Sequence, residues 1–107
     1  GYMLGDLGAE VIKVEEPGKG DPSRGSEKLW DRQMMLPGGL NLVFETFNRN
    51  KRGITLNLRS EKGLEVFHRL VKRSDVFYTN YREELRRRIG IDYESVSIIC
   101  VVYGTKF

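Results

Sequence analysis

The amino-acid sequence predicts an α/β fold in which a parallel sheet is flanked by helices. Apolar runs at 54–58, 75–79 and 98–103 have the length of strands, and helical patterns at 61–73 and 83–89 separate them. The runs are nearly continuous in apolar residues, which is typical of parallel strands buried on both faces. The chain also opens on the end of a helix, so we expect an incomplete N-terminal part of a larger domain.

The first elements are predicted from apolar spacing and capping residues. Leu4 and Leu7 have helical spacing within 1–7, and Gly8 follows where a left-handed C-cap is needed. A short strand is expected next at 9–15, because Val11, Ile12 and Val14 are apolar, with Lys13 interrupting them.

The region between this strand and the next contains many chain breakers. Residues 16–25 hold three glycines and two prolines and are predicted to form a loop. An irregular helix is expected at 26–36, with Ser26 as its N-cap, and the Pro-Gly-Gly sequence at 37–39 ends it. No secondary structure is assigned to 40–47.

A polar, basic turn at 48–52 leads into the predicted strand at 54–58. The turn contains three cations and two amides. It would present guanidinium and ammonium groups to a multiply charged anion, while the strand holds the backbone rigid. The alternative is a solvated basic loop ahead of an ordinary strand.

The clearest predicted helix spans 61–73. Apolar side chains recur along it at three- and four-residue spacing, and Ser60 is its predicted N-cap. A second, strongly basic helix at 83–89 ends at Gly90, and Asp92 is expected to cap one further helical turn.

The composition fits one domain, or a piece of a larger one, with a modest positive charge. The 107 residues carry a formal net charge of +3 and a pI of about 9.1, which suits a phosphate-bearing small molecule at least as well as a nucleic acid. The single cysteine, Cys100, excludes an internal disulfide and a metal site built from several cysteines. Because we find no membrane-length apolar window and no signal peptide, we expect a soluble cytoplasmic protein without a membrane partner.

Polar residues follow two of the predicted strands. Arg59 follows 54–58, and Asn80, Tyr81 and Arg82 follow 75–79. The carboxyl ends of parallel strands meet at one edge of a sheet, where ligands of such folds bind. We therefore expect a ligand site at this edge.

Three motifs in this order resemble the N-terminal portion of family III CoA-transferases. This is the CaiB/BaiF group, which includes carnitine CoA-transferase, formyl-CoA transferase and 2-methylacyl-CoA racemase. The motifs read DLGAEVIKVE (6–15) with GDPSR (20–24), NRNKRGITLNL (48–58), and DV (75–76), NYR (80–82) and RIGIDYE (88–94). The resemblance covers nearly the whole chain.

The resemblance implies a Rossmann-like large domain that binds coenzyme A, of which 1–107 would be a part. Members of the family pass CoA between carboxylic acids through an aspartyl-CoA thioester, and close relatives racemise 2-methylacyl-CoA. The implied partners are an acyl-CoA, a carboxylic acid and a second copy in an interlocked homodimer, with no nucleic acid. Coenzyme A is the implied cofactor, and no metal is implied.

The family's contacts to CoA come from its second and third motifs. Carried over to this sequence, the contact residues are Leu56, Asn57, Leu58, Arg59, Asn80, Tyr81, Arg82 and Arg88. Guanidinium groups suit the pyrophosphate and the 3′-phosphate of CoA. Tyr81 would stack on adenine or fill a gap, and Arg88 would bind phosphate or share a solvated helix face with Arg86 and Arg87.

The sequence also departs from the family pattern. Glu16 stands where relatives sometimes carry a basic residue, which removes one possible phosphate contact. The family's first strand and a CoA-binding loop would precede Gly1. The nucleophilic aspartate of the family would lie beyond Phe107, so no catalytic residue is assigned and the chain alone is expected to be inactive.

Three other functions stay open. Two of them keep CoA: a 2-methylacyl-CoA racemase-type enzyme, and a noncatalytic subunit of a two-subunit CoA-transferase. The third is a basic nucleic-acid-binding module that uses Arg49, Lys51, Arg52 and the arginines at 86–88. The small net charge and the lack of a recognised nucleic-acid motif argue against the third.

Overall fold

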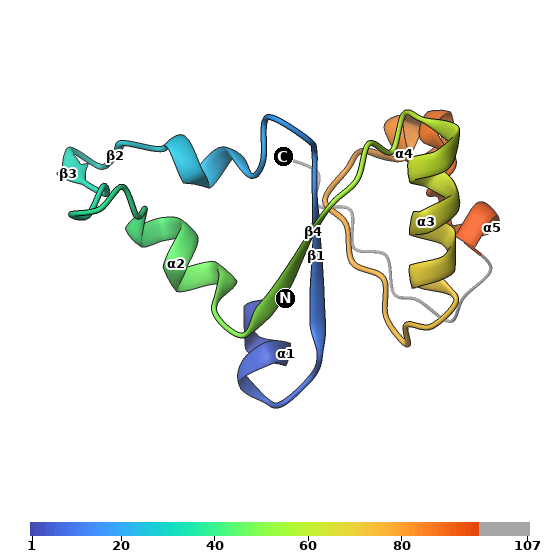
Figure 1. Cartoon of the computed structure of the whole chain (residues 1–107), viewed down its shortest axis with the longest axis horizontal. Coiled ribbons are helices and arrows are strands. Elements are labelled where there is room, and N and C mark those ends of the chain that lie inside the picture. Colours follow the sequence, from blue (N-terminus) through green and yellow to red (C-terminus); the bar gives the residue numbers. More distant parts are fainter. Residues whose placement is uncertain (97–107) are drawn as a thin grey trace. The chain divides into compact units, whose positions relative to one another are not determined.

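The structure is a computed structural model that describes residues 1–96. It consists of two compact units: the N-terminal unit spans Gly1–Thr55, and the C-terminal unit begins at Leu56. Figure 1 shows the helices and strands of each unit. The strand predicted at 98–103 lies outside the described residues.

The N-terminal unit contains a two-stranded parallel sheet. Strand β1 (Val11–Glu15) pairs residue for residue with β4 (Lys51–Thr55). Helix α1 (Tyr2–Asp6) precedes β1, and Gly8 between them has a φ of +93°, which residues with a Cβ rarely adopt. The predictions of an α/β fold with a parallel sheet flanked by helices, of the opening helix and of a strand within 9–15 are therefore confirmed.

Strand β4 begins and ends earlier than the predicted strand at 54–58. It pairs only with β1, which has five residues, so the ladder runs out at Thr55. Lys51 and Arg52, which were assigned to a turn, are the first residues of the strand. Leu56 and Leu58 instead pack against the core of the C-terminal unit.

The connection from β1 to β4 holds three small structures. A 3₁₀ turn, η1 (Pro22–Gly25), lies in the predicted loop, and a hairpin of β2 (Lys28–Leu29) and β3 (Arg32–Gln33) follows it. Helix α2 (Leu42–Asn48) comes next. The Asn41 side chain caps α2 by accepting hydrogen bonds from two backbone N–H groups of its first turn, at 2.9 and 3.2 Å.

The irregular helix predicted at 26–36 is wrong. Trp30 and Asp31 have φ values of 47° and 61°, and two central residues of positive φ are what a two-residue hairpin turn requires. The N–H of Met34 donates to the carbonyl of Glu27 at 2.8 Å, across the base of the hairpin. Because the charged residues of this segment interrupt any helical apolar stripe, a helix here would have had no face to bury.

The C-terminal unit is helical and has one apolar core in the part that the structure describes. Helices α3 (Glu61–Val71), α4 (Glu83–Ile89) and α5 (Tyr93–Val96) occupy the predicted places, although α3 ends two residues early. The buried side chains of the core are Phe67, Val71, Ile91 and Val96, and the half-buried ones packed against it are Leu56, Leu58, Leu64, Phe77 and Ile89.

The helix ends in this unit follow the predicted capping residues. Ser60 Oγ accepts a hydrogen bond from the N–H of Gly63 at 3.1 Å. Gly90 ends α4 with a φ of +71°, and Asp92 Oδ1 accepts from the N–H of Ser95 at 2.9 Å. Within residues 1–96, no helix has both the length and the apolar composition that crossing a membrane requires.

The strand predicted at 75–79 is wrong. Phe77 packs against the core, and its ring meets that of Phe67 edge to face with centroids 5.2 Å apart. Val76 and Tyr78 are 54% and 57% exposed. Among residues 56–96 no strand lies beside this run, and extended backbone needs a hydrogen-bonded neighbour to form a sheet.

Candidate functional site

The first predicted site segment, residues 56–59, forms the turn that leads into α3. Asn57 Oδ1 accepts a hydrogen bond from the N–H of Arg59 at 3.0 Å. The Asn57 carbonyl accepts two more from Ser60, from its N–H at 3.0 Å and its hydroxyl at 2.9 Å. Leu56 and Leu58 point into the core, which leaves Asn57 and Arg59 exposed.

Gly63 allows this turn to lie against the start of α3. A Cβ on Gly63 would be 2.1 Å from the carbonyl oxygen of Asn57 and 2.9 Å from Ser60 Oγ, much closer than atoms approach. A signal for this contact is present in the sequence. After a Ser N-cap, a capping box would have Glu or Gln at position 63, and a glycine there indicates that no side chain fits. The polar face of the turn therefore depends on a glycine inside the helix.

The second segment consists of Asn80, Tyr81 and Arg82. Its backbone is anchored by the buried Thr79, whose hydroxyl accepts a hydrogen bond from the N–H of Tyr81 at 3.2 Å. All three side chains of the segment are exposed. The segment leads directly into α4 and, contrary to prediction, does not follow a strand.

Arg88 lies in the last turn of α4 and is exposed. The next residue, Ile89, packs against the core, so the two side chains leave the helix in different directions. Arg87 is also exposed, as predicted, and its Nη2 lies 2.5 Å from Glu83 Oε1, one helical turn away. Arg86, by contrast, is half-buried rather than on a solvated face.

One apolar core carries all three segments. Leu56 and Leu58 belong to the first segment and pack against the core directly. Phe77 does so shortly before the second segment, and Ile89 does so next to Arg88. The structure therefore brings the predicted residues into one unit, although within residues 56–96 it shows no hydrogen bond or ion pair between the three segments.

The arginines of the chain divide into paired and unpaired groups. Ion pairs with carboxylates hold Arg24, Arg49, Arg52 and Arg87. Among residues 1–96, no carboxylate forms an ion pair with the site residues Arg59, Arg82 and Arg88, and all three are exposed. An exposed guanidinium without a carboxylate is free to bind a phosphate.

Two of the three cations of the basic turn at 48–52 are paired with carboxylates of their own unit. Arg49 Nη2 lies 2.5 Å from Asp6 Oδ2, and Arg52 Nη1 lies 2.5 Å from Glu10 Oε1. The hydrogen bond from Arg49 holds the pKa of Asp6 below its ordinary value. These pairs occupy two of the three cations, which argues against an anion site at this turn.

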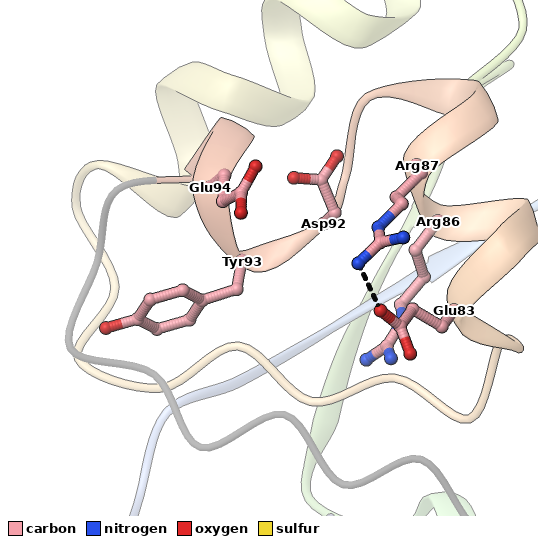
Figure 2. Close-up of a pocket in the computed structure, with 6 residues that line it drawn as sticks. All are labelled: Glu83, Arg86, Arg87, Asp92, Tyr93 and Glu94. Carbon is pink, nitrogen blue, oxygen red and sulfur yellow. Dashed lines mark ion pairs between the residues drawn. The ribbon is translucent and has the colours of Figure 1, made fainter.

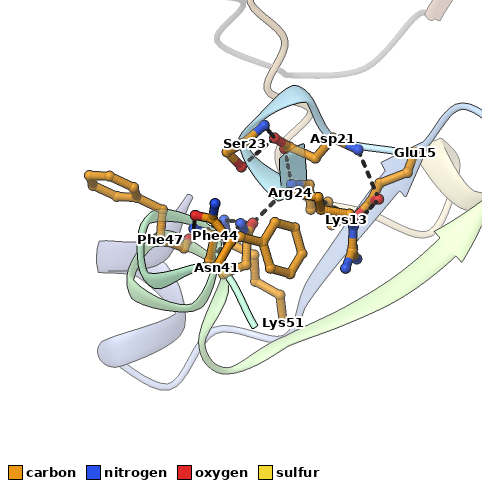
Figure 3. A network of polar contacts seen from close by, with 10 residues as sticks. Lys13, Glu15, Asp21, Ser23, Arg24, Asn41, Phe44, Phe47 and Lys51 are labelled. Atoms are coloured by element: carbon orange, nitrogen blue, oxygen red, sulfur yellow. Dashed lines mark hydrogen bonds and ion pairs between the residues drawn. The ribbon is translucent and has the colours of Figure 1, made fainter. Parts of the chain in front are cut away.

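A polar network that the sequence analysis missed joins β1 to η1 and α2 (Figure 3). Lys13 forms an ion pair with Asp21 and donates a hydrogen bond to Asn48 Oδ1 at 3.0 Å. Its ammonium group also lies 4.9 Å from the centre of the Phe44 ring. The signal in the sequence was the charge of Lys13 between the apolar residues Ile12 and Val14.

Two carboxylates of this network are held in their ionised form. Arg24 donates two hydrogen bonds to Glu15, at 2.9 and 3.0 Å, and they lower the pKa of Glu15. Burial disfavours ionisation of Asp21, but hydrogen bonds from Lys13 and Ser23 outweigh it and lower the pKa from 3.8 to about 2. Both carboxylates therefore fix the loop to the sheet rather than serve as proton donors near neutral pH.

Glu16 lies in the exposed turn after β1. Its side chain pairs with Lys19 at 3.3 Å, so this position carries a local surface ion pair instead of a basic group.

A small hollow lies between α4 and α5 (Figure 2). Its lining residues are Glu83, Arg86, Arg87, Asp92, Tyr93 and Glu94, none of which is a predicted site residue. Its volume of about 170 Å³ is below the 300–1,000 Å³ that is usual for small-molecule sites. Three carboxylates in the lining make it unsuitable for phosphate.

The described residues form an α/β protein. One unit contains a parallel sheet, and the other contains a helical core and exposed site arginines that have no ion pair with a carboxylate. Residues 1–100 match the family model of CoA-transferase family III. The chain belongs to this family.

Named relatives agree with the family match. The chain is 38% identical over 96 residues to the (R)-2-hydroxy-4-methylpentanoate CoA-transferase of Clostridioides difficile, a match that covers 88% of this chain and 23% of that protein. It is 40% identical over 97 residues to the formyl-CoA:oxalate CoA-transferase of Afipia carboxidovorans, covering 91% and 22%. This chain thus spans little more than a fifth of the length of the curated relatives it matches.

A solved structure supports the fold. The chain superimposes on a CaiB/BaiF family protein from Brucella suis with a TM-score of 0.80 and 37% sequence identity. The superposition covers 95% of this chain and 28% of that one.

Proposed function

We propose that residues 1–107 are the CoA-binding N-terminal portion of the large domain of a CoA-transferase that moves CoA between carboxylic acids. The family match supports the reaction class, since the named relatives are CoA-transferases for several different acids. The proposed chemistry is nucleophilic catalysis by an aspartate that forms an aspartyl-CoA thioester. No residue of this chain is proposed as the nucleophile, and the whole protein is proposed to be an interlocked cytoplasmic homodimer.

The observation that carries the binding proposal is that all three arginines on the predicted contact list, Arg59, Arg82 and Arg88, are exposed and have no ion pair within the described residues. Arg32, Arg69 and Arg73 are also exposed and unpaired there, but they lie outside the motifs that supply the family's contacts to CoA. CoA carries a pyrophosphate and a 3′-phosphate, to which guanidinium groups form charge-assisted hydrogen bonds. The ring of Tyr81, 41% exposed, suits stacking on adenine. The turn of Leu56, Asn57 and Leu58 and the side chain of Asn80 complete the proposed contacts.

The ion pairs argue against a nucleic-acid-binding module. That function would use Arg49, Lys51, Arg52 and the arginines at 86–88 as phosphate contacts. Three of these residues, Arg49, Arg52 and Arg87, already pair with carboxylates. The names of the relatives likewise favour transfer over racemisation.

Isothermal titration calorimetry of the chain with CoA, ADP and a short RNA tests the proposal. We expect CoA to bind more tightly than ADP, because ADP lacks both the 3′-phosphate and the pantetheine arm. Equal affinity for CoA and ADP would contradict the proposal, and so would RNA binding with a steep dependence on salt.

A further inference from the structure

Two lysines of the N-terminal unit share one amide oxygen. The Nζ atoms of Lys13 and Lys51 each lie 3.0 Å from Asn48 Oδ1. Lys13 comes from β1, Lys51 from β4, and Asn48 is the last residue of α2. Because the amide oxygen carries no formal charge, it links the two ammonium groups without neutralising either of them.

The two lysines differ in their other partners (Figure 3). Lys13 forms an ion pair with Asp21. Lys51 Nζ donates to the carbonyl of Phe47 at 2.7 Å and to Asn48 Oδ1, and both acceptors are neutral. Within residues 1–96, no carboxylate forms an ion pair with Lys51. Its surroundings therefore stabilise a charged amine less than those of Lys13 do.

The contacts of Lys51 fit a neutral amine. A neutral amine has two N–H donors and one lone pair, and the two acceptors engage both donors. Burial and the charge of Lys13 lower the pKa of Lys51, while Asp21 acts in the opposite sense. Gly1 also lies beside Lys51 Nζ, since a Cβ built on it would be 3.5 Å away. The side chain is only half-buried, so a reagent can reach it.

We propose that Lys51 Nζ is a site of N-acylation by acyl thioesters, with acyl-CoA as the natural source. The nitrogen lone pair attacks the thioester carbonyl carbon, a C–N bond forms and the C–S bond breaks. The proton lost from nitrogen leaves with the departing thiolate as free CoA thiol, and the product is an uncharged amide. The proposal rests on the proposed function only for the acyl-CoA that brings acyl groups to this chain.

Site-resolved mass spectrometry of the chain after timed incubation with two reagents tests the proposal. One reagent is acetyl-CoA, and the other is S-acetyl-N-acetylcysteamine, a thioester without phosphates. Lys62, an exposed lysine on α3, is the internal reference. We expect Lys51 to be acetylated severalfold faster than Lys62 by both reagents, and an equal or lower rate at Lys51 would overturn the proposal. A failure of CoA binding would leave the phosphate-free reagent unaffected, which separates the two proposals.

The variant Asn48→Asp examines the cause of the reactivity. It places a carboxylate between Lys13 and Lys51, which favours the protonated amine. We expect the acetylation of Lys51 relative to Lys62 to slow severalfold, and an unchanged ratio in a folded variant would overturn the role of the shared amide. Circular dichroism checks folding, and if the variant does not fold, the comparison of Lys51 with Lys62 in the original chain decides.

Discussion

The backbone oxygen of Asn57 occupies the space that a side chain on Gly63 would need, since a Cβ there would lie 2.1 Å away. The same oxygen accepts two hydrogen bonds from Ser60. The start of α3 and the turn before it are thereby held together. The exposed position of Arg59, two residues after Asn57, depends on this contact.

Gly63→Ala is expected to destabilise the chain by about 1–3 kcal/mol, as overpacking does. The loss should exceed the gain of roughly 1 kcal/mol that Ala brings to a helix interior. Urea unfolding followed by circular dichroism measures the change. Gly53→Ala is the matched control, because nothing lies within 4 Å of its Cβ position. Unchanged or increased stability of Gly63→Ala would show that the turn does not need the glycine.

Arg88→Ala is expected to weaken CoA binding by about 1–3 kcal/mol, because it removes a charge-assisted hydrogen bond to phosphate. Arg87→Ala is the control, since Arg87 is one residue away, equally charged and already paired with Glu83. Calorimetric titration of both variants compares them. If both lose affinity equally, the effect is one of general charge, and the assignment of Arg88 to the site fails.

The stability of the chain should fall in acid because of Asp21. The pKa of Asp21 is about 2 in the folded state, against an ordinary value of 3.8. Ionised Asp21 therefore adds to the free energy of unfolding, and this contribution is fully present above the ordinary pKa. As the pH falls from about 4 to 2, protonation breaks the ion pair with Lys13, at a cost of up to about 2 kcal/mol. Asp21→Asn should reduce this loss, as measured by urea unfolding at a series of pH values.

Asp31→Asn serves as the control for the acid series, because Asp31 is exposed at the hairpin turn and has no ion pair within residues 1–96. This variant should keep the full dependence on pH. The same slope in Asp21→Asn and Asp31→Asn would assign the acid sensitivity to other carboxylates.

The double substitution Trp30→Asn with Asp31→Gly is expected to stabilise the hairpin by roughly 0.5–1 kcal/mol. Both positions have positive φ, which Asn and Gly adopt more readily than Trp and Asp. Trp30 is 88% exposed, so removing its ring loses little burial. Thermal unfolding measures the effect, and Trp30→Ala, which keeps the backbone strain, should show no gain. A lower midpoint for the double variant would mean that the ring has a partner.

Local signals made the helix ends of the C-terminal unit predictable. Ser60, Gly90 and Asp92 each act on backbone groups within a few residues, so their effects can be read from the sequence alone. Strand boundaries depend on a distant partner instead. The run at 75–79 has strand-like composition but no neighbouring strand in the described unit, and its residues divide between core and solvent.

The sequence cannot distinguish Arg49 from Arg59. One arginine precedes β4 and the other follows it within a few residues, but the fold places Asp6, 43 residues before Arg49, against Arg49 alone. The contact between Lys13 and Asn48 likewise spans 35 residues, which explains why the polar network was missed. Family resemblance supplied the list of site residues, and none of the arginines on that list has an ion pair within residues 1–96.

The pairing of β1 with β4 also affects how the chain folds. The two strands meet only after residues 16–50 have closed into a loop. That closure costs conformational entropy before the first hydrogen bond between the strands forms. Helices such as α3 need only neighbouring residues and form within microseconds. We therefore expect helical turns to form before the sheet assembles, so that Lys51 and its neighbours acquire their native contacts late in folding.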